Sequence, residues 1–470
     1  MIANQVIKFF KNICKIPHPS NHEQRLVKYL NLEFKKMGCI TKIDNADNLI
    51  VRNFEHKTKN VITLQAHSDM VPVKTPSNHH NFLKDPIIVK QLGGWLKSCN
   101  TTLGADDGIG IAMIMSIFAD KHFKNIPLEA LITSREETGM WGTKGINKND
   151  IYGEYLINID SEMESDIVIA CLGGANVDAT IPINWVNAQD NDITYQIDIS
   201  GLIGGHSGSS IQFHRLNAIK AIGFILNEIT DCDLRIAHIN GGTLSGSIPI
   251  NANAIVNISY PNLDRFILKL ENAKIKLSKK YPLEKIHLKV TKLPQAKKVM
   301  ANTKNIINTI INVFDGLRVF NQKLKLPQES SNLGVLKIDN DQIIITIFVR
   351  GLILKEIKKT TSMITKTIVD NGGTVNPRWS IVWNPTLKIP TIAKQLQKLA
   401  KQHGRTMRMA YSPGGIETKH LARLVPTLKE LISIGPNVLN AHSPNEKVEI
   451  ASINRIHTLL REFILQHFGK

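Results

Sequence analysis

The chain has 470 residues, of which 42% are hydrophobic and 21% charged, and its formal net charge is +18. This length exceeds what one ordinary core holds and predicts two domains, and the composition is typical of a soluble globular protein. No apolar run approaches the roughly 18 residues that a membrane-spanning helix needs. The sequence therefore excludes proteins with membrane-spanning helices and predicts no membrane partner.

The five cysteines are scattered, odd in number and without a Cys-x-x-Cys pair. This usage predicts a reducing compartment, the cytoplasm, and excludes a disulfide framework and a thiolate metal site. The positive charge has two interpretations, nucleic-acid binding or lysines spread over solvated helix faces. The densest basic stretches, Lys274–Lys280 and Lys355–Lys359, lie in helix-patterned segments without interleaved aromatic residues. We therefore expect no nucleic-acid partner.

Helical and strand-like segments alternate in the N-terminal part of the chain. Helical periodicity marks Ile2–Ile13 and Glu23–Met37, and we expect the first to be an amphipathic helix and not a signal peptide. Short apolar runs predict buried strands at Val61–Ala66, Leu128–Thr133, Tyr155–Ile159 and Asp166–Cys171. Strands that alternate with helices predict an α/β domain, with a mostly parallel mixed sheet flanked by helices.

From about residue 187 the pattern changes to that of an α+β unit. The segments from Ile193–Ser200 to Lys285–Lys292 follow the order strand, helix, strand, strand, helix, strand, which is ferredoxin-like. Residues 303–383 follow a second, partial copy of this plan, and α/β character returns after residue 384. We expect one larger catalytic domain, formed by residues 1–186 and 385–470, and an inserted lid domain of ferredoxin-like units, residues 187–384.

The stretch Thr102–Gly110, TLGADDGIG, sets two acidic residues in a glycine-rich turn before the apolar run Ile109–Ala119. Such a turn at the start of a helix lets the backbone approach a bound group closely. Two adjacent carboxylates repel each other unless positive charge lies nearby, which favours a metal site. Taken alone, the stretch also fits a helix capped by Asp106 or Asp107.

Other acidic and histidine residues follow the predicted strands, where parallel sheets bind their ligands. They are His67, Asp69, Glu136, Glu137 and Asp160, and the chain adds Asp106 and His442. This mixed nitrogen and oxygen set without cysteine fits two metal ions better than one tetrahedral zinc. Each residue alone also has a structural explanation, such as a buried core histidine or an acidic first helical turn. Their joint placement at strand ends favours the metal site.

The pattern also suggests individual roles. Asp106, in its glycine turn, suits a carboxylate shared by two ions. Asp69 follows His67 by two residues, so its carboxylate is expected to orient the imidazole ring. Adjacent side chains diverge, so one of Glu136 and Glu137 is expected to bind metal while the other acts as general base.

Seven motifs, QAHSDMVP, TLGADDGIGIA, EETGM, INIDSE, GLIGGHSG, FVRG and IGPNVLNAHSPNE, occur in this order. With them the chain resembles the aminoacyl-histidine (Xaa-His) dipeptidases, which belong to the dinuclear-zinc aminoacylase/carboxypeptidase family of metallopeptidases. The likeness runs from the IPHPSNHE turn nearly to the C-terminus. It implies a cytosolic enzyme that cleaves Xaa-His and similar short peptides, with two zinc ions per chain; such sites also accept manganese or cobalt.

The resemblance also implies a role for each site residue. One zinc ion would be held by His67 and Asp160, the other by Glu137 and His442, and Asp106 would bridge the two. The remaining roles are orientation of His67 by Asp69, general base catalysis by Glu136, polarisation of the scissile carbonyl by His206, and substrate binding by Arg350 and Glu417.

Two departures from the dipeptidase pattern concern substrate recognition. Residues 241–249 read GGTLSGSIP where the dipeptidases read GGTLRNAIP, so Gly246 replaces a lid asparagine. Residues 413–419 read PGGIETK where they read HAGLECG, so Pro413 replaces a histidine. The alternatives are therefore a deacylase or carboxypeptidase of the same family, or a metal-retaining binding protein without turnover. The oligomeric state is a further alternative: the protein is a homodimer, or a monomer in which one half of the lid replaces a partner subunit. The second arises because the lid is nearly twice as long as one ferredoxin-like unit.

Overall fold

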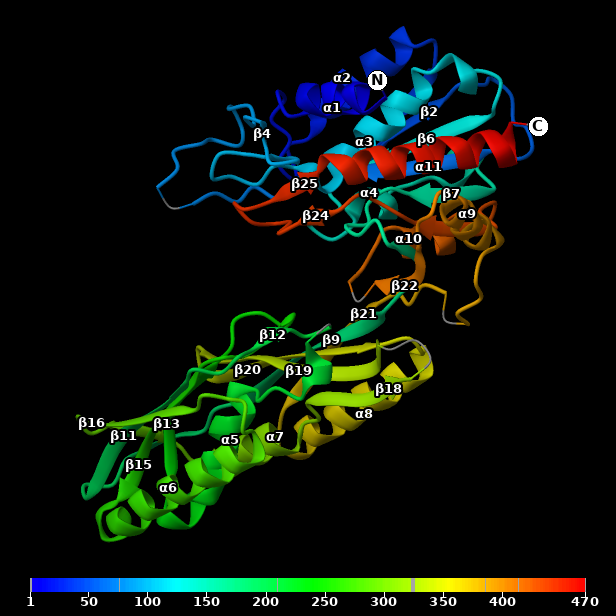
Figure 1. Ribbon diagram of the computed structural model, residues 1–470. Helices are drawn as coiled ribbons and strands as arrows, with labels where there is room; N and C mark the ends of the chain where they lie inside the picture. Colours follow the sequence, from blue (N-terminus) through cyan, green and yellow to red (C-terminus); the bar gives the residue numbers. More distant parts are fainter. Residues whose placement is uncertain are drawn as a thin grey trace. The chain divides into compact units, whose positions relative to one another are not determined.

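The computed structural model describes residues 2–75, 77–208, 210–322, 326–384, 386–412 and 414–469. The chain divides into two compact units, Met1–Cys171 with Thr386–Lys470, and Leu172–Pro385 (Figure 1). Each unit has its own hydrophobic core. Pro413, which replaces the dipeptidase histidine, lies outside the described residues. No helix in the described ranges is both long and apolar enough to cross a bilayer.

The first unit is built on an eight-stranded sheet with the order β1-β2-β6-β3-β7-β23-β8-β22. Its strands are β1 (Ile40–Ile43), β2 (Leu49–Arg52), β3 (Ile62–His67), β6 (Leu128–Thr133), β7 (Tyr155–Asn158), β8 (Asp166–Cys171), β22 (Arg408–Ser412) and β23 (Glu430–Ser433). The neighbours β6, β3, β7 and β23 run parallel, as do β8 and β22. Both β3 and β6 are buried along their whole length, as their largely apolar sequences predict, and the polar residues that they contain are buried too.

Seven α-helices accompany this sheet in the described residues. They are α1 (Ile2–Ile13), α2 (Gln24–Lys36), α3 (Ala105–Phe118), α4 (Trp141–Lys144), α9 (Thr391–Gln402), α10 (Thr418–Leu424) and α11 (Ile450–Phe468). Helix α3 is buried on nearly every side and contacts both α1 and β3, which explains its apolar sequence. A small sheet, β24-β25-β5-β4, joins β4 (Lys90–Leu92) and β5 (Trp95–Lys97) to β24 (Val438–Leu439) and β25 (Lys447–Glu449).

The inserted unit is built on one antiparallel sheet, with the order β16-β11-β15-β13-β19-β20-β9-β21 and with β18 paired to β19. Its strands are β9 (Gly173–Pro182), β11 (Asp192–Ser200), β13 (Arg235–Gly241), β15 (Ala252–Ser259), β16 (His287–Leu293), β18 (Gly316–Asn321), β19 (Leu326–Asp339), β20 (Gln342–Gly351) and β21 (Thr374–Ser380). Its helices are α5 (Ala218–Glu228), α6 (Leu263–Lys280), α7 (Thr303–Asn312) and α8 (Leu354–Asp370). Two short pairs, β10 (Trp185–Asn187) with β17 (Lys298–Met300) and β12 (Gly205–His206) with β14 (Ser247–Ile248), complete it.

Two ferredoxin-like halves form this unit. The first runs β11-α5-β13-β15-α6-β16 and the second β9-α7-β19-β20-α8-β21, with the first inserted after β9 of the second. They join edge to edge where β13 meets β19, with Gly241 opposite Leu336. Lys220 of α5 adds a link between the halves, because its Nζ donates to the carbonyls of Ile310, Ile311 and Val313 at the end of α7. The predicted α/β domain with an inserted α+β lid is confirmed as a fold class.

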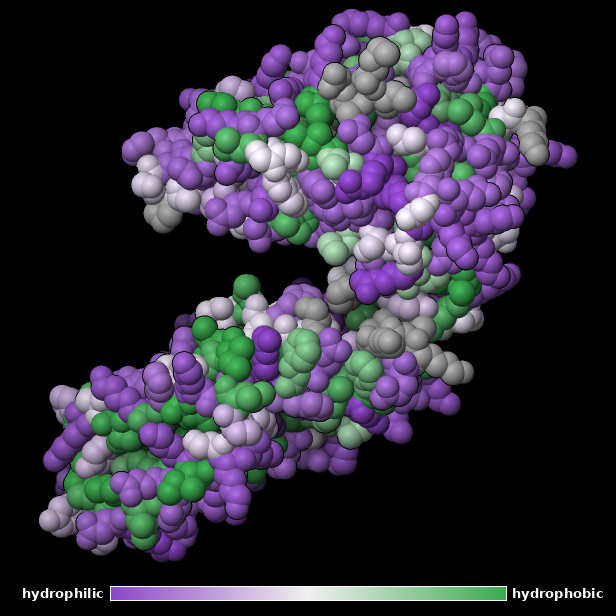
Figure 2. Space-filling view, in the orientation of Figure 1, coloured by the Kyte–Doolittle hydropathy of each residue, from purple (hydrophilic) through white to green (hydrophobic). Residues whose placement is uncertain are grey.

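The first boundary of the inserted unit differs from the one expected from sequence. The structure groups Leu172–Pro385, whereas the sequence pattern placed the start of the lid at residue 187. The difference is β9, which follows β8 after a single residue but pairs with β20 and β21 of the lid sheet. Figure 2 shows apolar patches among the hydrophilic surface of this unit. Leu268 and Ile275 of α6 are two of its exposed apolar residues.

Candidate metal centre

Six polar side chains lie at the carboxyl edge of the central parallel strands. His67 ends β3, Glu136 and Glu137 follow β6, and Asp160 follows β7. Because these strands are parallel neighbours, their carboxyl ends share one edge of the sheet. Asp106 is added by the turn that opens α3, and His442 by the loop after β24.

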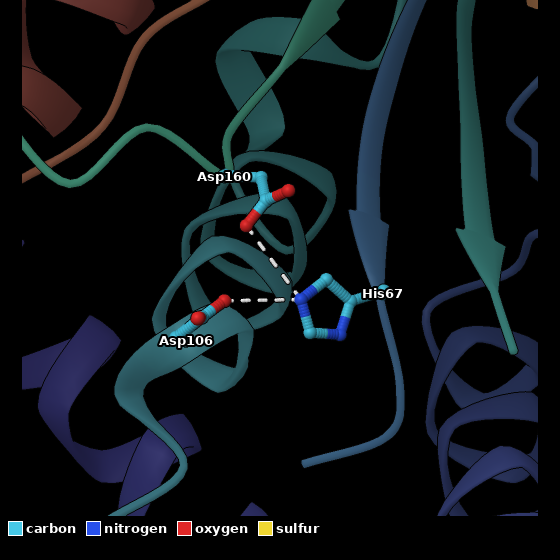
Figure 3. Close-up of side chains that lie close together, drawn as sticks. All are labelled: His67, Asp106 and Asp160. Carbon is cyan, nitrogen blue, oxygen red and sulfur yellow. Dashed lines mark hydrogen bonds and ion pairs between the residues drawn. The ribbon is translucent and has the colours of Figure 1, made fainter. Parts of the chain in front are cut away.

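Asp106 lies between the two histidines. Its Oδ1 is 3.0 Å from His67 Nε2, which is also 3.6 Å from Asp160 Oδ1 (Figure 3). Its Oδ2 is 3.1 Å from His442 Nε2, which is 2.8 Å from Glu137 Oε1. Two ligands of one tetrahedral zinc ion lie roughly 3.3 Å apart, so these separations suit shared cations. All five residues predicted as metal ligands therefore come together in two groups that share Asp106, and a third group places Glu136 beside His67 and Glu137.

The neighbouring carboxylates raise the pKa of both histidines. Hydrogen bonds to Asp106 and Glu137 raise the pKa of His442 to about 11. Burial lowers the pKa of His67, but hydrogen bonds to Asp106 and two further aspartates outweigh burial and raise it well above its usual value. Both rings thus lie where positive charge is strongly favoured.

Two acids of the cluster, Asp160 and Glu136, have pKa values above those of ordinary carboxyl groups. Burial raises the pKa of Asp160 to about 7, and burial raises the pKa of Glu136 well above its usual value. Carboxylates gathered in a buried site keep their charge when divalent cations lie among them. Imidazole nitrogen and carboxylate oxygen without thiolate are also a donor set that zinc, manganese and cobalt accept. The residues present therefore fit a metal centre.

Asp69 is buried and fixes two parts of this cluster. His67 Nδ1 donates to the Asp69 backbone carbonyl at 2.9 Å, and a carbonyl only accepts, so Nε2 is the nitrogen left for a metal ion. The Asp69 carboxylate, 3.6 Å from the ring, accepts instead from the backbone N–H groups of Glu136 and Glu137 and from Ser20 Oγ. The sequence predicted that the carboxylate orients His67; in the structure the carbonyl makes the closer contact and the carboxylate holds the glutamate turn.

Asp107 has a different position from its neighbour. Its Oδ2 accepts from His67 N–H and its Oδ1 from Gly110 N–H, each at 3.2 Å. The peptide bond between Asp106 and Asp107 is cis. The two interpretations of this motif thus apply to one aspartate each: Asp107 caps α3 and Asp106 faces the histidines. The sequence offered Asp107 only as a candidate helix cap, and that is the contact it makes with Gly110.

Glu446 was missed. Its carboxylate is 2% exposed and accepts four backbone N–H groups, those of residues 103 to 106. It is the final residue of the motif IGPNVLNAHSPNE, so the sequence did contain a signal.

Glu417 does not reach the surface of the site, contrary to the predicted substrate contact. Its side chain is fully buried, and its Oε2 accepts from Gln65 Nε2 and Thr133 Oγ1, each at 2.5 Å. Burial raises the pKa of Glu417 to about 8. Gln65 and Thr133 belong to β3 and β6, so Glu417 supports the sheet beneath the cluster.

The remaining predicted residues belong to the inserted unit. His206 lies in β12, and its Nδ1 accepts from Gly208 N–H at 3.2 Å. Arg350 lies near the end of β20, with its guanidinium 4.1 Å from the centre of the Phe348 ring. Burial lowers the pKa of His206, and the charge of Arg350 lowers it further. The lid sequence therefore brings these two side chains into one electrostatic neighbourhood.

Comparisons with known proteins identify relatives of this chain. The chain is 30% identical to the cytosol non-specific dipeptidase of Escherichia coli strain K12, over 97% of this chain and 96% of that relative. The crystal structure of an aminoacylhistidine dipeptidase from Vibrio alginolyticus matches with a TM-score of 0.85 and 28% identity, over 99% of this chain and 96% of that one. An aminopeptidase from Bacillus cereus, 16% identical with a TM-score of 0.58 over 100% of this chain and 99% of its own, shares the fold.

The family model described as peptidase family M20/M25/M40 matches residues 63–466, which include all five candidate ligands. The predicted kinship to metallopeptidases is confirmed by this match and by the full-length relative. The chain belongs to peptidase family M20/M25/M40.

Proposed function

We propose that this protein is a metal-dependent dipeptidase that hydrolyses the peptide bond of short peptides, Xaa-His dipeptides among them. The observation that carries the proposal is Asp106, whose two oxygens face His67 and His442 within a group completed by Asp160 and Glu137. Support comes from two relatives, named dipeptidases, that match nearly the whole chain.

Two zinc ions per chain suit the donor groups best. His67 and Asp160 would hold one, Glu137 and His442 the other, and Asp106 would contact both. Divalent ions in such a site lower the pKa of water and polarise a carbonyl group. Manganese and cobalt accept the same nitrogen and oxygen donors, so zinc is the proposed ion and not a unique solution.

Glu136 is the proposed general base. It follows β6 directly before Glu137, and adjacent side chains diverge, so it can face the attacking water while Glu137 faces His442. Burial raises the pKa of Glu136, which favours uptake of a proton from that water. Glu136 then delivers the proton to the leaving amine, so one carboxylate serves both halves of the reaction.

Two lid residues would recognise the substrate. Gly208 N–H donates to His206 Nδ1, so in the neutral ring Nε2 carries the proton and can donate to the oxygen of the scissile carbonyl. Arg350 presents a guanidinium fork that suits the terminal carboxylate of a peptide. Selection of a carboxylate at a fixed distance from the scissile bond would confine the enzyme to short peptides.

Two residues expected to contact the substrate offer no side chain for that contact, which favours a broad substrate range. Gly246 has no side chain, and a Cβ placed there would have no neighbour within 4 Å among the described residues. Glu417 is buried in the sheet. We therefore propose a broad dipeptidase without a strict Xaa-His requirement. The proposed location is the cytoplasm, in line with the name of the Escherichia coli relative.

A substrate panel with zinc-loaded protein tests this function. Dipeptides, including β-Ala-His, should be cleaved with kcat/KM at least 100-fold above that for tripeptides and N-acyl amino acids. Preference for tripeptides or N-acyl amino acids would instead indicate a carboxypeptidase or a deacylase. Retained zinc without turnover of any substrate would indicate a binding protein.

A further inference from the structure

A buried carboxylate lies beneath the turn that carries Asp106. Glu446 Oε2 accepts from the N–H groups of Leu103 at 2.7 Å and Gly104 at 3.1 Å. Its Oε1 accepts from Ala105 at 2.7 Å and Asp106 at 3.3 Å. Both oxygens are therefore used, by four successive backbone donors from a segment about 340 residues earlier in the chain.

The turn needs such a partner. The first N–H groups of a helix have no acceptor within the helix, and Asp106 and Asp107 have non-helical φ and ψ angles ahead of the regular turns of α3. Gly104 has a left-handed φ of 69°, and successive N–H groups around such a residue converge on one point, where they bind an anion. Because Glu446 is 2% exposed, its carboxylate fills this position in place of water.

The same residue fixes the loop that carries His442. Glu446 N–H donates to the Ser443 carbonyl at 3.1 Å, and Ser443 Oγ donates to the Asn440 carbonyl at 2.8 Å. These bonds make residues 440–446 one compact turn, so the anchor at Glu446 also limits the movement of His442. On the other side of the anchor, His442 Nε2 meets Asp106 Oδ2 at 3.1 Å.

We propose that Glu446 is a positioning residue that sets the separation of Asp106 and His442, and thereby the affinity for the cation held by Asp106, Glu137 and His442. The inference rests on the metal centre of the proposed function. Removal of a group that orients metal ligands typically weakens metal binding about 10- to 100-fold, and we expect a loss of this size.

Glu446→Gln tests the proposal, with Glu430→Gln as the matched control. Glu430 also accepts a backbone N–H at a helix start, from Ile392 at 2.8 Å, but through one oxygen that glutamine retains. At Glu446 glutamine replaces one of two used acceptors with an N–H₂ donor that faces backbone N–H groups. Zinc dissociation constants are measured for the full chain by competition with a chromophoric chelator, and thermal unfolding is measured on the metal-free forms.

We expect one of the two zinc equivalents to bind 10- to 100-fold more weakly in Glu446→Gln, with kcat restored by excess zinc, and both equivalents to be within twofold of wild type in Glu430→Gln. Wild-type zinc affinity in Glu446→Gln would overturn the inference alone, because Glu446 would then only stabilise the turn. A wild-type protein without zinc affinity would overturn the proposed function itself.

If Glu446→Gln does not fold, zinc affinity is measured for Glu446→Asp instead. Aspartate retains the charge but is one methylene shorter, so it reaches fewer of the four donors. Its zinc affinity should lie between those of wild type and the expected glutamine variant. Wild-type affinity at both equivalents would overturn the positioning role.

Discussion

Buried carboxylates hold three ligand-bearing segments of the candidate metal centre through backbone N–H groups. Asp69 binds the turn of Glu136 and Glu137, Asp107 binds the N–H of His67, and Glu446 binds the turn of Asp106. A carboxylate that accepts backbone N–H groups satisfies donors that would otherwise be buried without partners. The ligands therefore start from fixed backbone positions, which lowers the ordering cost of metal binding.

The proposed role of Glu136 as general base can be tested by a single substitution. Glu136→Ala should retain the wild-type zinc content while kcat falls about 100- to 10,000-fold, because the variant lacks the group that moves the proton. Metal analysis and steady-state kinetics on the same preparation measure both quantities. A kcat within tenfold of wild type would remove Glu136 from the base role, whereas loss of zinc would place it among the ligands.

At the scale of elements, α3 shows why the motif needs its last glycine. A Cβ on Gly110 would lie 2.2 Å from Asp107 Oδ1 and 2.8 Å from the Ile159 carbonyl oxygen. Neither position can move freely, because Asp107 caps the helix and Ile159 precedes Asp160 next to β7. The glycine thus allows α3 to approach the sheet closely enough for Asp106 to meet His67.

Gly110→Ala should therefore lower the free energy of unfolding by about 1–3 kcal/mol, the usual cost of forcing an extra carbon into a packed interior. Gly246→Ala is the control, since a Cβ there meets nothing within 4 Å among the described residues, and its effect should stay within about 0.5 kcal/mol. Denaturant unfolding of the metal-free proteins measures both. Equal stabilities for the two variants would contradict this account of α3.

Helix α11 contains a buried histidine that gives a pH prediction. His457 is fully buried, neither ring nitrogen has a hydrogen-bond partner among the described residues, and burial lowers its pKa to about 4, with Arg461 lowering it further and Asp120 opposing. The unfolded chain binds this proton near pH 6.5 and the folded chain only near pH 4, so stability falls as pH drops between these values. The loss at pH 5 is about 2 kcal/mol.

His457→Leu removes the titrating group and its unpartnered nitrogens. Between pH 7 and pH 5 the variant should lose about 2 kcal/mol less stability than wild type, as measured by unfolding at both pH values. The stability of each protein at pH 7 is its own reference, so the gain from removing the unpartnered nitrogens does not enter the comparison. The same pH dependence in both proteins would show that His457 does not control acid stability.

The sequence predicted those strands that are determined by residues close together in the chain. The strand Leu128–Thr133 was predicted with the bounds that β6 has, and β3 within one residue, because continuous apolar runs define them. Strand β9 was not predicted, because its pairing with β20 and β21 depends on residues far along the chain. Among the candidate ligands, His67, Glu137 and Asp160 stood out at strand ends and Asp106 in its glycine turn, whereas the four contacts of Glu446 come from residues about 340 positions away. Local patterns cannot reveal such contacts, nor the burial of Glu417.

At the scale of the whole molecule, both ends of the chain build the metal centre. The candidate ligand His442 and the residue Glu446 belong to Thr386–Lys470, and the other four candidate ligands belong to Met1–Cys171, so the first unit is complete only when both segments fold together. The inserted unit has its own core, and none of its described residues belongs to a candidate metal group. Metal binding should therefore stabilise one unit and not the other.

Calorimetry with and without a chelator tests this division. Removal of zinc should lower the unfolding temperature of one transition and leave a second unchanged, because a ligand stabilises only the unit that binds it. At a free zinc concentration about 1,000 times the dissociation constant the stabilisation is about 4 kcal/mol. A shift of both transitions, or of neither, would contradict the assignment of the metal centre to the first unit.

Anomalous diffraction at the zinc edge, from crystals of the zinc-loaded protein, shows whether these five side chains bind two metal ions. We predict two peaks about 3.5–4 Å apart, with Asp106 between them, His67 and Asp160 beside one, and Glu137 and His442 beside the other. Peaks elsewhere in the molecule, or no peak among these five side chains, would contradict it.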